Sequence, residues 1–246
     1  MISNHARNRE GKTSLPTQWQ YTPEEASWLA RQWTKALWNQ SLWKRVHWLG
    51  VPVLQWPTDL LVMQELITRL CPSSIIETGL YLGGTSVFYA SILQLLGIAG
   101  RVISIDIQIH PEARRNIENS PVRDRIHLIE GDSKSEAVHR QLRDLLRADT
   151  NVLVCLDSDH SYAHTLAELR LFSQYVPVGG YLVLFDTICE DLADTPNGEA
   201  SWTHDSPMAA VRQFLAENSD FSSDRECEKL LVTFAPGGFL VRKSRA

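Results

Sequence analysis

The sequence lacks the features of a membrane or secreted protein. None of its apolar runs approaches the ~20 residues that span a bilayer, and the polar N-terminus, MISNHARNREGKTS, has no apolar core of a signal peptide. Only four cysteines occur, and none is closely paired in sequence. Cys155 lies inside an apolar strand pattern, where a reduced, buried thiol is expected. We therefore expect a protein of the reducing cytoplasm with no membrane partner.

An excess of positive charge is also missing. The formal net charge is -5 and no long basic run occurs, so we expect no nucleic-acid partner held through its phosphates. The sequence has no internal repeat and no low-complexity tract. Its 246 residues, 43% hydrophobic and 22% charged, suit one α/β domain with an appendage.

The first 58 residues predict a tail and a Trp-rich helical extension. Residues 1–20 are expected to be disordered or loosely docked. Residues 21–58 begin with a helix that Thr22 can cap, with Pro23 in its first turn. Tryptophan recurs every five residues from Trp28 to Trp48, so these rings do not share one helix face. The stripe that does share a face is Leu29, Trp33 and Leu37.

Two interpretations of this extension stay open. The rings can add contacts to the core of the main domain. Alternatively, they can face a second subunit or cover a pocket, because a large exposed apolar surface needs a reason. The second interpretation predicts a homo-oligomer formed through the Trp-rich segment.

Strand and helix patterns alternate from residue 59 onward. Asp59 can cap a helix that runs to about Leu70. The strand patterns that follow, each with a helical pattern behind it, are SIIETG, RVISIDI, RIHLIEGD, NVLVCLDSD and GYLVLFDT. This order predicts a doubly wound, mostly parallel sheet with helices on both faces. Residues 229–235 and 239–243 are predicted to close the chain as an antiparallel hairpin.

The turn after the first of these strands, IIETGLYLGGTS, is rich in glycine. Glycines at this place let the backbone approach a ligand and turn into a helix N-terminus. The turn has neither the Lys-Ser/Thr of a Walker loop nor the G-x-G-x-x-G spacing of dinucleotide enzymes. Glu77 at the strand end would repel a pyrophosphate and favour a cationic ligand end.

Polar residues also end the next two strands. Asp106 ends the second strand, where doubly wound folds hold a ribose diol, although an Asp there is also a common helix cap. The turn EGDS after the third strand could recognise an adenine edge. Together these signals predict a site for S-adenosylmethionine. Its predicted contacts are Glu77, Gly79, Gly83, Gly84, Thr85, Asp106, Asp132 and Ser133.

The segment LDSDHSYAHT follows the fourth strand and raises three possibilities: a metal site, an acid/base pair or a polar helix start. Asp159 can cap the following helix. His160 can act as a base or orient a carboxylate. His164, one helical turn on, is expected to be a packed or exposed helix residue. His204, in the loop after the fifth strand, is either a substrate contact or a solvated histidine.

Five segments carry a resemblance to a known family. They are WLG with WPTDLLVMQELI, IIETGLYLGGTS, LDSDHSYAHTLAEL, GGYLVLFDT and APGGFLVRK, in order from about Trp48 to Lys243. The sequence resembles the cephalosporin hydroxylase and rhamnosyl O-methyltransferase family of class I methyltransferases. The resemblance implies a Rossmann-like, seven-stranded methyltransferase domain, here residues 59–246. It also implies S-adenosylmethionine, a divalent cation, usually magnesium, and methyl transfer to a hydroxyl. The expected acceptor is a glycoside or another secondary metabolite, as in natural-product or antibiotic biosynthesis.

One departure from the family concerns the metal. Family members commonly have Glu-Asp at the end of the fifth strand, where this chain has Phe185 and Asp186. The resemblance then implies a metal held by Asp157, Asp186 and a neutral oxygen of Thr187, with Asp159 as a substitute. A hard cation can lower the pKa of a sugar hydroxyl and orient it. The predicted catalytic residues are Asp157, which would bind the cation, and His160, which would act as a base or orient a carboxylate.

Two other functions remain open from the sequence. One is a hydroxylase or oxidoreductase that uses a dinucleotide on the same fold, against which Glu77 and the broken glycine spacing argue. The other is a binding protein that has lost catalysis, which Phe185 favours.

Overall fold

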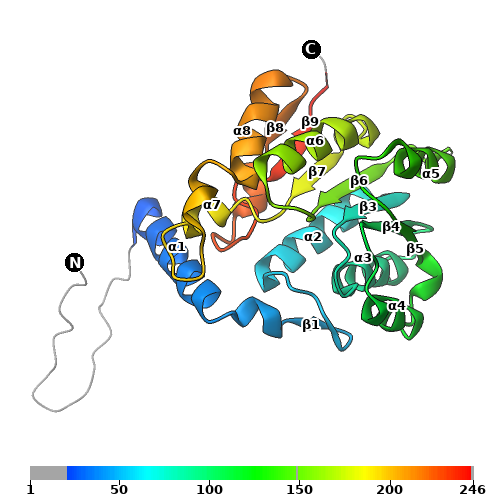
Figure 1. Ribbon diagram of the computed structural model, residues 1–246, viewed down its shortest axis with the longest axis horizontal. Coiled ribbons are helices and arrows are strands. Elements are labelled where there is room, and N and C mark those ends of the chain that lie inside the picture. Colours follow the sequence, from blue (N-terminus) through cyan, green and yellow to red (C-terminus); the bar gives the residue numbers. More distant parts are fainter. Residues whose placement is uncertain (1–20, 148, 245–246) are drawn as a thin grey trace, which may run out of the picture.

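A seven-stranded sheet forms the centre of the computed structural model, which describes residues 21–147 and 149–244 (Figure 1). Its order is β5-β4-β3-β6-β7-β9-β8. Strands β3 to β7 are parallel, and β9 is antiparallel to both of its neighbours. The strands are β3 (Ser74–Thr78), β4 (Arg101–Asp106), β5 (Ile126–Glu130), β6 (Val152–Leu156), β7 (Tyr181–Leu184), β8 (Phe221–Ser223) and β9 (Phe239–Arg242). The predicted doubly wound, mostly parallel sheet is confirmed; the predicted tail, residues 1–20, lies outside the described residues.

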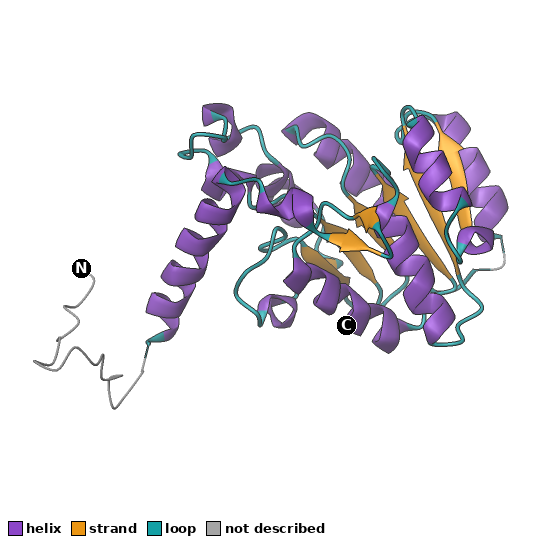
Figure 2. Ribbon diagram, turned by 90° about the horizontal axis from the view of Figure 1, so that it is seen from below, coloured by secondary structure: helices purple, strands orange, loops and turns teal. Residues whose placement is uncertain are grey.

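Helices cover both faces of the sheet (Figure 2). One face packs against α2 (Pro57–Leu70), α3 (Gly84–Leu95) and α4 (Pro111–Glu118). The other packs against α5 (Glu136–Leu146), α6 (Tyr162–Phe172) and α8 (Pro207–Glu217). Successive residues of a strand feed the two cores in turn, as Ile75 and Ile76 of β3 do. The sequence shows unbroken apolar strands because both faces are buried.

The predicted cap of α1 (Pro23–Asn39) is confirmed, whereas the predicted cap of α2 is wrong. At α1, Thr22 and Glu25 form the capping box that the sequence predicts in part. Asp59 does not cap α2, because that helix begins at Pro57, with Trp56 as its N-cap residue. The Asp59 side chain instead lies in the first turn and accepts a hydrogen bond from the Phe234 N–H at 2.8 Å.

The closing antiparallel pair is present, but its first strand lies elsewhere. β9 pairs with β8, residues 221–223, and not with residues 229–235. Backbone groups of the 229–235 segment bond to other elements: the Val232 carbonyl accepts from Thr58 Oγ1, and the Phe234 carbonyl accepts from the Ile188 N–H. A segment whose backbone groups are used in this way has none to offer to a ladder.

The N-terminal extension runs from α7 (Cys189–Leu192), beside which its first helix lies, to α3, on which its hairpin packs (Figure 1). It contains α1, the 3-10 helix η1 (Leu42–Arg45) and a two-stranded hairpin, β1 (His47–Trp48) with β2 (Val51–Pro52). Trp38 stacks on Trp43, with ring centroids 5.5 Å apart, and both rings meet the edge of Phe234. Added core contact therefore accounts for part of the Trp series, whereas Trp28 and Trp33 stay 57% and 59% exposed.

No helix within the described residues is long and apolar enough to cross a membrane.

Candidate active site

A pocket of about 1010 Å³ lies at the carboxyl ends of the parallel strands. Ligands of open α/β sheets bind at this edge, where the strand order reverses. Here the reversal falls between β3 and β6. The predicted site residues that line the pocket are Gly79, Gly84, Thr85, Asp106, Asp132, Ser133, Asp157, His160 and Asp186. The sheet thus brings the acid cluster and all predicted cofactor contacts except Glu77 and Gly83 into one pocket.

The glycine turn is fixed by close backbone approach. A β-carbon on Gly79 would lie 1.7 Å from the Asp157 carbonyl oxygen, and the φ of Gly79 is +84°. A β-carbon on Gly84 would lie 2.1 Å from the Pro52 carbonyl oxygen. Both positions therefore require glycine for packing the turn against β6 and against the extension. Gly83 precedes α3 in the left-handed conformation and does not line the pocket.

Asp106 organises the same turn from the neighbouring strand. Its Oδ2 accepts hydrogen bonds from the N–H groups of Leu80 and Tyr81, at 2.9 and 3.2 Å. Oδ1 accepts from the Gln108 N–H at 3.2 Å. Each carboxylate oxygen has more than one lone pair, so the side chain can hold the turn and still accept from a ligand hydroxyl.

Glu77 lies beneath the pocket and does not line it. It is 2% exposed and accepts hydrogen bonds from Ser86 and Ser104. Burial raises the pKa of this carboxyl to about 7, although the hydroxyl donors lower it. Its observed contacts support the glycine turn from inside the protein.

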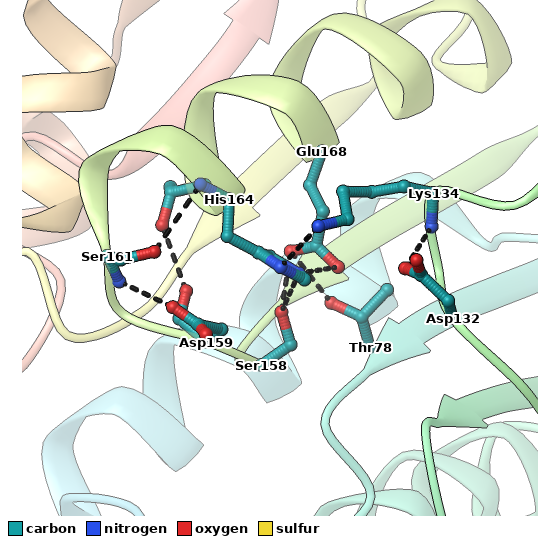
Figure 3. A network of polar contacts seen from close by, with 9 residues as sticks. Thr78, Asp132, Lys134, Ser158, Asp159, Ser161, His164 and Glu168 are labelled. Atoms are coloured by element: carbon teal, nitrogen blue, oxygen red, sulfur yellow. Dashed lines mark hydrogen bonds and ion pairs between the residues drawn. The ribbon is translucent and has the colours of Figure 1, made fainter.

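A buried carboxylate, Glu168, organises the β6 side of the pocket (Figure 3). This α6 residue is 1% exposed and accepts from Ser158 Oγ at 2.7 Å and from Thr78 Oγ1 at 3.4 Å. His164 Nε2 lies 3.3 Å from it, and Lys134 Nζ lies 3.0 Å from His164 Nδ1. The hydrogen bond that the His164 imidazole donates to the Glu168 carboxylate is the largest reason why the pKa of His164 is raised. Thr78, Lys134, Ser158 and His164 all line the pocket.

Asp157, His160 and Asp186 form the acid cluster at the ends of β6 and β7. His160 Nε2 lies 3.1 Å from Asp186 Oδ2 and 3.5 Å from Asp157 Oδ1. Burial opposes the charged imidazolium, but the two carboxylates outweigh it and raise the pKa of His160 to about 9. Burial also opposes the charged form of Asp186 and therefore raises the pKa of this carboxyl, whereas the charge of His160 lowers it. Asp186 adopts a left-handed φ of 54°, a conformation that occurs at functional sites at a cost of about 1–3 kcal/mol.

The cluster fits a hard divalent cation. One oxygen or nitrogen from each of these three residues lies within 4.8 Å of the others, and His160 Nε2 is a buried atom without a hydrogen bond among the described residues. Carboxylate oxygens with a few further ligands are what magnesium and manganese prefer.

Other predicted residues lie around this cluster. Phe185 is 1% exposed and packs in the core, so no third carboxylate is present at that position. The Thr187 hydroxyl donates to the Pro236 carbonyl at 2.8 Å, and Thr187 does not line the pocket. Asp159 accepts from the Ser161 N–H, but Ser161 is the residue that caps α6. His204 is exposed, contacts Thr203 Oγ1 and does not line the pocket.

Several residues that line the pocket, and one buried neighbour of it, were not predicted as site residues. Trp43 and Lys44 of η1 line the pocket, as does Lys134. Gln55, in the loop before α2, donates from Nε2 to Asp157 Oδ2 at 2.7 Å. The regular Trp series already singled out Trp43, but nothing in the local sequence marks Gln55.

The fold and this pocket define a class I methyltransferase, the class that transfers methyl groups from S-adenosylmethionine. The family model described as "Rhamnosyl O-methyltransferase/CmcI" matches residues 40–243. The chain therefore belongs to this family. The predicted family, fold class and S-adenosylmethionine-dependent O-methyltransferase activity are confirmed, and the dinucleotide alternative is not favoured.

Individual proteins agree with this assignment. The chain is 30% identical over 198 residues to the rhamnosyl O-methyltransferase of Mycobacterium leprae (strain TN), across 79% of this chain and 82% of that protein. It is also 30% identical over 200 residues to that of Mycobacterium tuberculosis (strain ATCC 25618 / H37Rv), across 79% and 77%.

Solved structures agree on the fold. A CmcI structure titled as a complex with Mg and SAM superposes with a TM-score of 0.58 at 20% identity, across 82% of this chain and 78% of that chain. A second CmcI structure, titled with SAH, has the same TM-score at 18% identity, across 94% and 96%.

Proposed function

We propose that the protein methylates a hydroxyl of a sugar or natural-product intermediate, with S-adenosylmethionine as the methyl donor and a divalent cation in the acid cluster. The observation that carries the proposal is the single pocket of about 1010 Å³ that joins the glycine turn and Asp106 to Asp157, His160 and Asp186. The names of the curated relatives support a sugar acceptor.

The cofactor would occupy the part of the pocket formed by β3, β4 and β5. Asp106 would accept hydrogen bonds from the ribose hydroxyls, and the turn with Asp132 and Ser133 would contact the adenine. Gly79, Gly84 and Thr85 would border the methionine part, with Gly83 and Glu77 supporting them from below. Bound in this way, the methionine part would lie between the glycine turn and the acid cluster, which line the same pocket.

Asp157 and Asp186 would hold the cation, with His160 beside them. A bound cation would lower the pKa of an acceptor hydroxyl. When bound, S-adenosylmethionine would supply the methyl group, whose bond to sulfur would break as its bond to the acceptor oxygen forms, and His160 Nε2 would take the proton of that hydroxyl. Because the two carboxylates hold His160 in its charged form, it can accept that proton only once their charge is compensated. Thr187 as a neutral ligand stays a prediction.

The acceptor would lie on the side formed by the extension. Trp43 and Lys44 line the pocket there, and an indole ring offers a sugar an apolar surface beside polar groups. The exposed rings of Trp28 and Trp33 support the proposal that a homo-oligomer forms through the extension.

A screen of glycosides and phenols for S-adenosylhomocysteine release, with and without EDTA, tests this function. We expect turnover of one glycoside class that EDTA abolishes and Mg²⁺ restores. Asp157→Asn should lose turnover, whereas Asp124→Asn, at an exposed position, should retain it. Turnover that is indifferent to EDTA would contradict the metal role. Absence of turnover combined with no binding of S-adenosylhomocysteine would contradict the enzyme assignment.

A further inference from the structure

Gln55 is a buried polar residue whose amide is only half satisfied. Its side chain is 3% exposed, and Nε2 donates to Asp157 Oδ2 at 2.7 Å. Its Oε1 is buried and has no hydrogen-bond partner within residues 21–147 and 149–244. A buried acceptor left without a partner costs about 1–3 kcal/mol. The fold therefore keeps at this place an oxygen that is free to bind something else.

The loop that carries Gln55 is held in an unusual backbone conformation. Leu54, just before it, has a φ of 59°, which costs a non-glycine residue about 1–2 kcal/mol. On the near side, the Val53 N–H donates to the Val46 carbonyl at 2.9 Å. The Pro52 carbonyl fills the space that Gly84 leaves open. The loop is thus fixed on two sides while its strained residue turns Gln55 inward.

The two carboxylate oxygens of Asp157 have different neighbours. Oδ2 bonds to Gln55, whereas Oδ1 is the oxygen that lies 3.5 Å from His160 Nε2. Both polar atoms of an amide are attached to one carbon, so Oε1 lies in the same small region as Asp157 Oδ2. This region adjoins the acid cluster, which contains two carboxylates, because this chain has Phe185 where the family commonly has Glu.

We propose that Gln55 is part of the cation site: Nε2 orients Asp157, and Oε1 is a neutral oxygen donor to the divalent cation or to a water bound to it. The inference rests on the proposed metal-assisted function. An amide oxygen suits magnesium and manganese, which are bound by carboxylates and carbonyl oxygens. It supplies the missing oxygen without adding a third negative charge beside Asp157 and Asp186.

Titration of the full-length protein with Mn²⁺, followed by calorimetry and by the electron paramagnetic resonance signal of free Mn²⁺, tests this role. Gln55→Leu removes both polar atoms and should weaken the Mn²⁺ Kd by about 10- to 100-fold, the usual effect of losing a residue that supports a metal ligand. Gln55→Glu loses the Nε2 donor but keeps an oxygen and adds a charge, so it should bind Mn²⁺ more tightly than Gln55→Leu does. The matched control is Gln64→Leu on α2, whose amide donates to Thr68 Oγ1 at 2.8 Å; it should bind Mn²⁺ like the wild type.

The outcomes separate this inference from the proposed function. If the wild type binds Mn²⁺ and Gln55→Leu binds it equally well, Gln55 is no part of the cation site. If both Gln55 variants weaken binding equally, the residue is only structural and the inference is overturned. If the wild type itself binds neither Mn²⁺ nor Mg²⁺, the metal role fails and this inference fails with it. Thermal unfolding without metal identifies a variant that has not folded, and the other variant then decides.

Discussion

The carbonyl oxygen of Asp157 lies 1.7 Å from the point that a β-carbon of Gly79 would occupy. The turn after β3 and the end of β6 are therefore in direct backbone contact, at the place where the strand order reverses. The Asp157 N–H also donates to the Thr78 carbonyl at 3.0 Å, so the cofactor turn and the acid cluster are held together.

Gly79→Ala should separate these two strand ends. We expect a loss of about 2–4 kcal/mol in the free energy of unfolding, from strain at a positive φ and from overpacking against backbone, together with loss of S-adenosylhomocysteine binding. Urea unfolding and calorimetry measure the two effects. Gly97→Ala is the matched control: it has a φ of +67° with nothing within 4 Å, so it should lose only about 1–2 kcal/mol and keep its affinity. Equal effects of the two variants would refute the contact as the cause.

Asp106→Asn should weaken cofactor binding without unfolding the protein. The amide keeps an oxygen for the Leu80 and Tyr81 N–H groups but loses the charge that strengthens a hydrogen bond to a ribose hydroxyl. We expect a rise in the Kd for S-adenosylhomocysteine of about 10- to 100-fold, measured by calorimetry. Asp124→Asn, at a highly exposed acid, is the control, and an unchanged Kd in Asp106→Asn would exclude the ribose contact.

Asp59 should make stability depend on pH. Burial raises the pKa of this carboxyl from 3.8 to about 7, with Phe234 and Thr233 as opposing hydrogen-bond donors. The folded state then holds a proton that the unfolded state has released, so the free energy of unfolding falls as pH rises from about 4 through 7. A shift of this size corresponds to an upper limit of about 4 kcal/mol.

Urea unfolding from pH 5 to 8 checks this prediction on Asp59→Asn beside the wild type. The variant keeps an acceptor for the Phe234 N–H but has no proton to release, so its stability should fall less over this range. Because the pKa of Glu77 is also about 7, the free energy of unfolding should still fall with pH to some extent in both proteins. Parallel curves for the two proteins would show that Asp59 is not the source.

Trp38→Ala should affect the acceptor side of the pocket and spare the cofactor side. Trp38 stacks on the pocket residue Trp43 and donates Nε1–H to the Asn197 carbonyl at 3.3 Å. We expect a loss of about 2–4 kcal/mol of stability and a raised KM for the acceptor, with an unchanged Kd for S-adenosylhomocysteine. Trp28→Ala on the exposed face of the same helix should stay within about 0.5 kcal/mol of the wild type. A raised KM in both variants would contradict the role of Trp38.

The double variant Trp28→Ser with Trp33→Ser tests the proposed oligomer. Both rings are more than half exposed, so their removal should leave the fold intact while dissociating the assembly. Light scattering should report a multiple of 27.9 kDa for the wild type and a single chain for the variant. If the wild-type protein has the mass of a single chain, the proposed homo-oligomer is contradicted.

Much of the fold could be predicted because its signals are local. Each parallel strand is an apolar run buried on both faces, and Thr22 marks its helix start directly. The closing pair was misplaced for a reason that no local pattern contains. Residues 229–235 look like a strand, yet Thr58 and Ile188, far away in the chain, bond to their backbone. The prediction that Asp59 caps α2 is wrong because the helix begins two residues earlier, at Pro57, and the partner of the Asp59 side chain, Phe234, is distant in sequence.

The site divides in the same way. Asp106, Asp157 and Asp186 could be located because the ends of parallel strands meet at one edge of a sheet. Gln55 and Trp43 come from the extension, whose docking depends on tertiary contacts. Periodicity gives a helix its faces but does not say which of them meets another part of the chain: Leu37 is buried, whereas Trp33, on the same stripe, is exposed.

The docking of the extension has a consequence for synthesis on the ribosome. Lys35 bonds to Asp194 and Trp38 bonds to Asn197, and in each pair the partner lies 159 residues further along the chain. The partner of Gln55, Asp157, lies 102 residues further along. The Trp-rich segment therefore leaves the ribosome long before its partners exist. Since chains emerge from the N-terminus at about 5–20 residues per second, its apolar rings stay uncovered for many seconds. The side of the pocket that the extension forms is thus the first part of the site to be synthesised and among the last to be assembled.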